Sequence, residues 1–385
     1  MPAETLPMKK VTRLYLIKHH LFQKAKKQNL VNIVDDICGL HAQAAMTPYL
    51  SLWNRVEDFE DSLLDKALYR DKTLVKVWCM RGTLHVIPSL DLPVYNKALR
   101  TMWFEHHGRY MRAPEYPPKE ERKKVIYPKI VQALTEKPLK RKELNAKVQA
   151  ILKDDSKPYQ RLFSGWGGIL KETAYEGLTV HAEPCEREAC FARVDKWLPK
   201  IRLDNVSEEE AQEKLLIKYL SSYGPATAQD FCLWSGLMAG DARKAIEKVK
   251  DLLLEEVEIE GAKGLFLLLK QDLKLLDSIS LDEKALPRLL PKFDSYVLGH
   301  KDRTRIIDDE HKKHVFRKAG DIAATLLIDG RIMGTWTHKR GKNSVAITIT
   351  PFHRLDKDEL RLIEEEARKL GQFMGVAQLK LLFTR

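Results

Sequence analysis

The stretch GLHAQAAMTPYLSLWNRV, residues 39–56, joins two polar side chains to an apolar, helix-like run. His41 and Gln43 stand two residues apart, ahead of Pro48 and the run that contains Trp53. Two interpretations of the pair are open. The side chains can satisfy backbone groups where one helix ends and the next begins, or they can form a functional site. The choice depends on the rest of the chain.

The residues on either side of this stretch show two hydrophobic periods. Apolar residues recur every three to four positions over 11–28, 30–40 and 59–69, which predicts three amphipathic helices. Residues 74–78 and 83–87 instead favour two strands, joined by a turn in which Gly82 can adopt a positive φ. Helices followed by a two-stranded ribbon are typical of a winged-helix module, which places a helix in the major groove of a duplex.

This order of elements recurs along the chain. The proline-rich segment 112–119 (RAPEYPPK) ends the first module. Ser207, followed three residues later by Glu210, has the spacing of a capping box and begins the third module. The repeat predicts an α+β fold of three tandem winged-helix modules, at 1–111, 119–200 and 201–284, followed by a separate domain at 285–385.

The C-terminal domain is rich in predicted strands. The Asp329-Gly330 pair is a strong signal for a hairpin turn. A second turn carries the basic tip 338–343, which is suited to contact a groove or a phosphate. We expect a barrel-like domain covered by a helix at 356–370. The predicted strands are 293–298, 323–328, 332–336 and 345–350.

Composition indicates a globular protein. Hydrophobic residues make up 44% of the 385 residues and charged residues 31%. No run approaches the ~18 apolar residues that cross a bilayer, so we expect a cytoplasmic protein that associates with the nucleoid when bound to DNA and has no membrane partner. The five cysteines are odd in number and form no Cys-x-x-Cys pair, which favours reduced thiols over a disulfide framework or a zinc module.

The net charge of +12 points to a polyanionic partner, and its distribution is uneven. Lys plus Arg exceed Asp plus Glu by 16 to 11 in residues 1–110, by 19 to 13 in 111–200 and by 20 to 13 in 285–385. In residues 201–284 the balance is reversed, 11 to 17. We therefore expect the acidic third module to contact nucleic acid least.

The sequence contains groups of histidines and a cluster of glycines, two features that occur in metal and nucleotide sites. The groups at 19–20, 105–107 and 311–314 lack the spacing of zinc ligands, so no metal is predicted. The glycines at 165–168 lack the Lys and the Ser or Thr of a P-loop, so no nucleotide cofactor is predicted.

Five segments in order resemble the winged-helix DNA-binding family that contains the AlkZ- and YcaQ-type DNA glycosylases. The first polar position of the family's Gln-x-Gln active-site segment is His41 here, and only Gln43 matches residue for residue. The resemblance implies an enzyme that removes bulky alkylated purines, including crosslinked bases, from duplex DNA. The five segments are 39–56, 78–85, 223–236, 293–303 and 329–336.

Within this resemblance, Gln43 and His41 are the catalytic candidates. A purine alkylated at N7 is cationic and departs readily, so a neutral amide that positions the attacking water can suffice. The imidazole of His41 can act as base, as donor to the departing base, or as a structural residue. The predicted DNA contacts are Trp78, Arg81, Lys140, Arg141, Arg303, Lys339 and Arg340.

A second function stays open from the sequence. The chain can be a non-catalytic DNA-binding protein, a regulator or lesion sensor, in which His41 and Gln43 only cap helices. Such a regulator would be expected to dimerise, because half-site reading favours two-fold symmetry. For the glycosylase we expect a monomer without cofactor.

Overall fold

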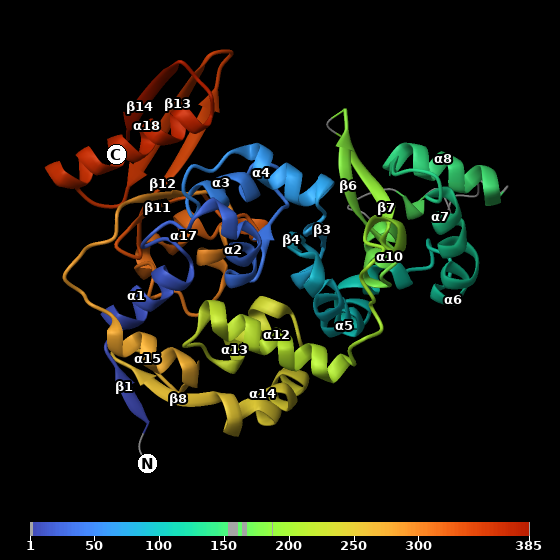
Figure 1. Ribbon diagram of the computed structural model, residues 1–385, viewed down its shortest axis with the longest axis horizontal. Coiled ribbons are helices and arrows are strands. Elements are labelled where there is room, and N and C mark those ends of the chain that lie inside the picture. The colour runs from blue at the N-terminus through green and yellow to red at the C-terminus, as the bar shows by residue number, and fades with distance from the viewer. Residues whose placement is uncertain (1–2, 153–160, 164–167, 187, 385) are drawn as a thin grey trace. The chain divides into compact units, whose positions relative to one another are not determined.

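The computed structural model describes residues 3–152, 161–163, 168–186 and 188–384 (Figure 1). The fold is mixed α+β, as predicted. The chain divides into two compact units, and each gathers segments that are distant in sequence. Unit 1 comprises Met1–Leu64, Ile217–Trp234 and Ile246–Arg385, and unit 2 comprises Asp65–Leu216 and Ser235–Ala245. Among the described residues, no helix is both long enough and apolar enough to span a bilayer.

The first sheet of unit 1 has the order β1-β8-β9 (Figure 1). The N-terminal strand β1 (Glu4–Leu6) pairs in parallel with β8 (Leu254–Ile259), and β8 pairs antiparallel with β9 (Phe266–Leu269). Strand β1 was not predicted, because its partner lies more than half the chain away. Helix α1 (Met8–Lys18) buries Val11 and Leu14 against this sheet, together with α15 (Lys270–Ser278).

The second sheet of unit 1 has the order β10-β11-β12-β13-β14. Asp329 (φ 43°) and Gly330 (φ 83°) join β11 to β12, and two positive φ angles are what a type I′ turn requires, so the Asp-Gly hairpin is confirmed. Within the described residues the sheet ends at β10 and β14, so the expected barrel-like closure is not observed. The strands are β10 (Arg288–Leu290), β11 (Thr325–Ile328), β12 (Arg331–Arg340), β13 (Ser344–Pro351) and β14 (Gln378–Phe383).

The predicted covering helix is present as α18 (Lys357–Phe373). Asp356 caps it: its side chain accepts from Glu359 N at 2.8 Å, and the Glu359 side chain accepts from Asp356 N at 2.9 Å. Glu366 of α18 is buried, 3.7 Å from Arg288 of β10. The helix therefore packs on the sheet near β10.

One predicted strand is wrong. Residues 293–298 are not extended: Phe293 has a φ of 58° and α16 (Ser295–Leu298) follows. The side chain of Asp294 caps this short helix by accepting from Tyr296 N at 3.0 Å. Aromatic and β-branched residues favoured a strand, but tertiary contacts of these side chains override that preference.

Unit 2 combines two hairpins into one sheet. The order β4-β3-β6-β7-β5 joins the predicted ribbon β3/β4 to the hairpin β6/β7, through a pair between Lys76 and His181. The two wings expected from separate modules are therefore contiguous. The strands are β3 (Leu74–Trp78), β4 (Leu84–Pro88), β5 (Leu139–Lys140), β6 (Thr179–Cys185) and β7 (Glu188–Arg193).

Two helices of unit 2 begin at residues that the sequence analysis named, Arg141 and Gly168. Lys140 belongs to strand β5, and helix α8 begins at the next residue, Arg141. Of the glycine cluster, Gly165 and Gly167 lie outside the described residues and Gly168 begins a helix. The main helices are α5 (Leu92–Met102), α7 (Tyr127–Ala133), α8 (Arg141–Leu152), α10 (Gly168–Tyr175) and α11 (Val194–Trp197).

The remaining helices belong to unit 1 or contain residues of both units. Ser207 and Glu210 form the predicted capping box at the start of α12, because Glu210 N donates to Ser207 Oγ at 3.2 Å and Ser207 N donates to the Glu210 side chain at 3.0 Å. The helices are α2 (Leu30–Asp36), α3 (Thr47–Trp53), α4 (Asp61–Asp65), α12 (Glu208–Tyr223), α13 (Ala228–Ser235), α14 (Ala239–Leu253) and α17 (Lys312–Val315).

Candidate functional site

The His41–Gln43 pair lies on a short loop of unit 1 between β2 (Leu40–His41) and α3. His41 is 5% exposed, whereas Gln43 is exposed to solvent. The His41 Nδ1 accepts from the Gln43 backbone N at 3.4 Å. An accepting Nδ1 puts the proton of a neutral imidazole on Nε2. The two candidate residues therefore differ in exposure: the side chain of His41 is buried in the protein, and that of Gln43 faces solvent.

Residues 292–296 contact the loop that carries His41 and Gln43. The rings of His41 and Phe293 stack with centroids 4.7 Å apart and planes 15° apart. Ser295 Oγ donates to the Gly39 carbonyl at 2.9 Å. Thr47 Oγ1, at the start of α3, donates to the Lys292 carbonyl at 2.8 Å. The loop is therefore attached to this segment at both of its ends.

A fully buried ion pair lies beneath the loop. The guanidinium of Arg55 donates to both oxygens of Asp294, at 2.6 and 2.9 Å, and neither side chain is exposed. Ser51 Oγ adds a bond to Asp294 at 2.8 Å. A buried carboxylate that accepts several hydrogen bonds and faces a forked guanidinium is well compensated. This pair ties helix α3 to the residue that caps α16.

The end of α2, just before Gly39, is held by residues near the C-terminal end of α12. Lys218 Nζ pairs with Asp35 Oδ1 at 2.6 Å, and Tyr223 OH donates to the Ile37 carbonyl at 3.3 Å. Ser222 Oγ donates to the Asp36 carbonyl. Residues 218–223 therefore set where the segment that carries His41 begins.

A cavity of about 330 Å³ lies beside the loop. Ala44 and Met46 form part of its wall, next to Gln43 in the chain. Lys292 and Arg317 bring two cations, and both lie within 4 Å of Asp321, so one positive charge remains in excess. The remaining lining residues include Thr47, Leu50, Pro291, Ala323, Ala324, Trp336, Thr337 and His338.

His338 of this cavity is harder to protonate than an ordinary histidine. Burial, and then the nearby Arg340 charge, lower the pKa of its imidazole below the ordinary value. The cavity is thus mostly apolar with cations at its edge, a composition typical of ligand sites.

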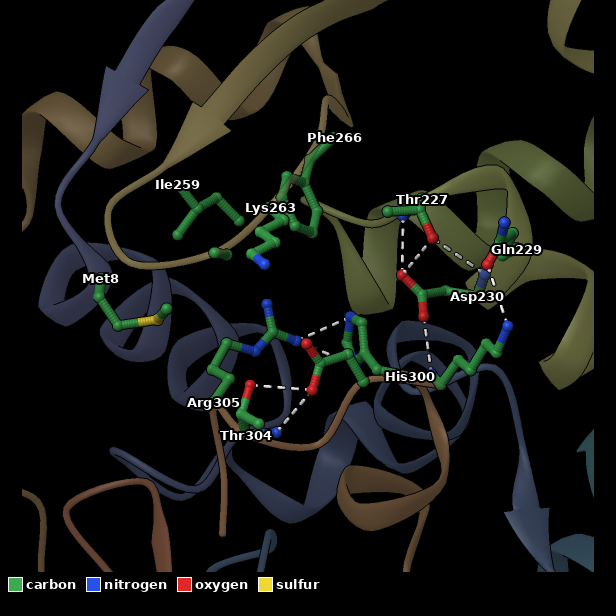
Figure 2. A pocket seen from close by; sticks show the side chains of 13 residues that line it. Met8, Thr227, Gln229, Asp230, Ile259, Lys263, Phe266, His300, Thr304 and Arg305 are labelled. Atoms are coloured by element: carbon green, nitrogen blue, oxygen red, sulfur yellow. Dashed lines mark hydrogen bonds between the residues drawn. The ribbon is translucent and has the colours of Figure 1, made fainter. Parts of the chain in front are cut away.

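A second cavity of unit 1, of about 360 Å³, lies where the segments 223–236 and 293–303 meet (Figure 2). Asp230 accepts from Thr227 N at 2.8 Å and from Lys301 N at 2.7 Å. Arg305 donates to the ring of His300, whose pKa burial lowers well below its ordinary value, so this imidazole stays neutral. Figure 2 shows these side chains turned toward one another. Because no lining residue comes from 39–56, we regard this cavity as a junction of the fold.

The predicted DNA contacts of unit 1 fall into two groups. Lys339 and Arg340 are exposed on β12, where Arg340 Nη2 donates to the Met374 carbonyl at 3.0 Å. Arg303 instead packs its guanidinium over the ring of Phe316, 3.7 Å from the centroid. Lys339 and Arg340 are therefore accessible to a bound duplex, whereas the guanidinium of Arg303 already packs on an aromatic ring of the protein.

The predicted DNA contacts of unit 2 differ more strongly in exposure. Trp78 is buried and packs against His181 and Phe191, with ring centroids 4.7 and 6.0 Å away, so we remove it from the predicted contacts. Arg81 is half-buried with a φ of 53°.

Two further cations of unit 2 lie at the start of α8. Lys140 pairs with Glu186, and burial lowers the pKa of the half-buried Arg141. No group of three His, Cys, Asp or Glu side chains suited to a metal ion was found among the residues that the structure describes.

Sequence reasoning missed three residues that hold the site in place: Arg55, Phe293 and Asp294. Arg55 carried a signal, because a charged residue at the end of an apolar run requires a buried partner. Nothing in the sequence identified that partner, since Arg55 and Asp294 are separated by 239 positions.

Comparisons with known proteins place the chain in a family. The model of the AlkZ-like DNA glycosylase family matches residues 34–373. An interstrand DNA cross-link repair glycosylase from Streptomyces sahachiroi is 28% identical over 360 residues, which cover 90% of this chain and 91% of that protein. The solved structure of Streptomyces sahachiroi DNA glycosylase AlkZ has the same fold, with a TM-score of 0.83 at 24% identity, over 99% of this chain and 100% of that chain. The chain therefore belongs to the AlkZ-like DNA glycosylase family and is a DNA glycosylase, a hydrolase of N-glycosyl bonds.

Proposed function

We propose that this glycosylase releases bulky N7-alkylated purines from duplex DNA and that Gln43 holds the attacking water. The observation that carries the proposal is the position of Gln43. Its side chain is exposed on a loop that is fixed from behind by His41 and Phe293, next to a cavity with an excess positive charge. An exposed group on a rigid support is what positioning chemistry needs.

The chemistry of the lesion suits an uncharged residue. A purine alkylated at N7 carries a positive charge, so its bond to the sugar breaks without strong protonation. The enzyme must then place a water at the anomeric carbon. The amide oxygen of Gln43 can accept a hydrogen bond from that water, and its NH2 group can donate to a neighbouring oxygen.

We propose that His41 is a positioning residue. Its ring is buried, stacks on Phe293, and accepts from the Gln43 backbone, so it fixes the loop on which the amide stands. This role accounts for a histidine where the family pattern has glutamine. Both side chains supply a neutral hydrogen-bonding group.

We extend the proposal to interstrand crosslinks. The Streptomyces sahachiroi relative is named for cross-link repair. A crosslinked base cannot leave the duplex freely, so it has to be reached in place rather than flipped into a deep pocket. An exposed Gln43 beside an open cavity is compatible with that requirement.

We also propose how the duplex is held. The surface cations Lys339 and Arg340 of β12, with Arg81, Lys140 and Arg141 in unit 2, contact phosphates. Winged-helix modules at 1–111, 119–200 and 201–284, the β-rich domain at 285–385, and action as a monomer are part of this proposal.

The test is release of free base from a duplex that carries one defined N7-alkylguanine. A second duplex carries one N7-linked interstrand crosslink. The proposal predicts release from the first and strand separation from the second, without added metal or cofactor. A protein that binds both duplexes tightly but releases no base would overturn the substrate assignment. A footprint that depends on sequence would instead favour a regulator.

A further inference from the structure

Two cysteines meet across the β6/β7 hairpin of unit 2. Cys185 is the last residue of β6, and Cys190 lies in β7. The pairing register shifts between Ala182 and Cys185, so that Cys190 stands opposite Ala182 while Cys185 stands opposite Glu188. The two Sγ atoms are 2.8 Å apart. A disulfide bond is about 2.05 Å long, so the sulfurs need to move less than an ångström to bond.

The two thiols differ in their access to solvent. Cys185 is exposed, whereas Cys190 is buried. Burial, followed by the hydrogen bond to Cys185, raises the pKa of the Cys190 thiol to about 12. The thiolate is the reactive form of cysteine, so the exposed Cys185 is the sulfur that reacts first with an oxidant in solution. Cys190 is then in place to react with the product.

We propose that Cys185 and Cys190 form a reversible thiol–disulfide pair that is oxidised by hydroperoxides. The Cys185 sulfur attacks a peroxide oxygen, the O–O bond breaks, and an alcohol or water leaves. The resulting sulfenic acid is attacked by the Cys190 sulfur. The S–S bond forms, and the sulfenic hydroxyl leaves as water with the Cys190 proton. One hydroperoxide is reduced for each disulfide formed.

The bond would close a small ring at the hairpin tip. Glu186 lies inside this ring, and its carboxylate pairs with Lys140 Nζ on the neighbouring strand β5. Glu188 Oε1 is 3.9 Å from the same ammonium. Oxidation therefore restricts the segment that carries both carboxylate partners of Lys140. The inference rests on the thiols alone and does not depend on the DNA substrate.

The test uses the full chain after complete reduction and removal of the reductant. Brief treatment with hydrogen peroxide should remove two of the five free thiols, and digestion should yield one peptide pair or ring linked through Cys185 and Cys190. Dithiothreitol should restore both thiols. An intact protein that keeps all five thiols, or that links a different pair, would overturn the proposal.

Three variants test the order of events. In Cys190→Ser the exposed Cys185 should stop at the sulfenic acid and react with dimedone. In Cys185→Ser the hairpin should give no dimedone adduct, because the remaining thiol is buried. Cys232→Ser is the matched control and should form the disulfide like the wild type. Equal labelling of the first two variants would contradict the proposed order, and Cys190→Ala provides the same test if serine is not tolerated in the buried position.

Discussion

The imidazole of His41 lies nearly parallel to the ring of Phe293, with centroids 4.7 Å apart and planes 15° apart. This stack joins the loop that carries Gln43 to the segment at 293–296. The neighbouring residue Asp294 holds that segment in place through its buried pair with Arg55. The positive φ of Phe293 (58°) turns the chain at this point, and the ring then covers the buried histidine. The arrangement explains why an exposed amide can keep a fixed place on a loop.

His41 should be replaceable by a neutral hydrogen-bonding residue. We expect His41→Gln to retain most of the rate of base release and His41→Ala to lose about 10- to 100-fold, because alanine removes both the stack and the acceptor for the Gln43 backbone. The measurement is the single-turnover rate between pH 5 and 8. If the imidazole acted as an acid or base, the rate of the wild type would change with pH near 6.5, as expected for a histidine. The rate of His41→Gln would then not change there, and it would be as low as that of His41→Ala.

Breaking the Arg55–Asp294 pair should destabilise the protein strongly. Asp294→Ala leaves the guanidinium buried without its partner, which costs about 3–5 kcal/mol of unfolding free energy. The double variant Arg55→Leu with Asp294→Leu should lose less than Asp294→Ala alone, since no charge then stays buried. Urea unfolding monitored by circular dichroism measures both. A small loss in the single variant would mean that water compensates Arg55.

His181 should make unit 2 sensitive to acid. Burial, and then the charges of Lys76 and Arg141, lower the pKa of this histidine to about 3. In the unfolded chain its pKa is about 6.5, so the unfolded state binds one more proton between pH 6.5 and 3, and stability is lost as the pH falls through that window.

Replacing His181 tests this contribution. When the pH is lowered from 7 to 5, the unfolding free energy should decrease in the wild type by about 2 kcal/mol more than in His181→Phe. Phenylalanine keeps an aromatic ring between Trp78 and Phe191. The comparison needs urea unfolding curves of both proteins at the two pH values, and parallel pH dependence would show that the histidine takes up no additional proton on unfolding.

The hairpin cations should contribute to duplex binding through phosphates. Lys339→Gln with Arg340→Gln should weaken binding uniformly across sequences and reduce the slope of log K against log salt by about 0.9 per lost contact. Lys248→Gln, exposed on α14 in the acidic part of the chain, is the control and should leave the slope unchanged. Fluorescence anisotropy at several salt concentrations gives the slopes. An unchanged slope in the double variant would remove this hairpin from the interface.

The sequence predicted those elements whose signals are local. The ribbon β3/β4, the Asp329-Gly330 turn and the capped start of α12 all depend on residues within a few positions of one another. Contacts between distant segments could not be predicted in this way. The strand expected at 293–298 failed because Phe293, Asp294 and Ser295 each take their conformation from partners in residues 39–55.

The candidate site was predicted only in part for the same reason. His41 and Gln43 could be found because they stand together in the chain, whereas Arg55, Phe293 and Asp294 support them from two separate segments. Trp78 was predicted to contact DNA within the family resemblance, and its ring proved to be packed against Phe191. Exposure of a single side chain depends on tertiary packing, which residue type alone does not determine.

The most direct test of the account is the Gln43→Ala variant in single-turnover release of N7-alkylguanine from duplex DNA. Gln28→Ala, which removes the same exposed side chain elsewhere in unit 1, is the matched control. The account predicts a loss of about 100-fold or more for Gln43→Ala, as for removal of one positioned catalytic group, with duplex affinity unchanged and the control at the wild-type rate. Release by Gln43→Ala as fast as by the wild type would contradict it.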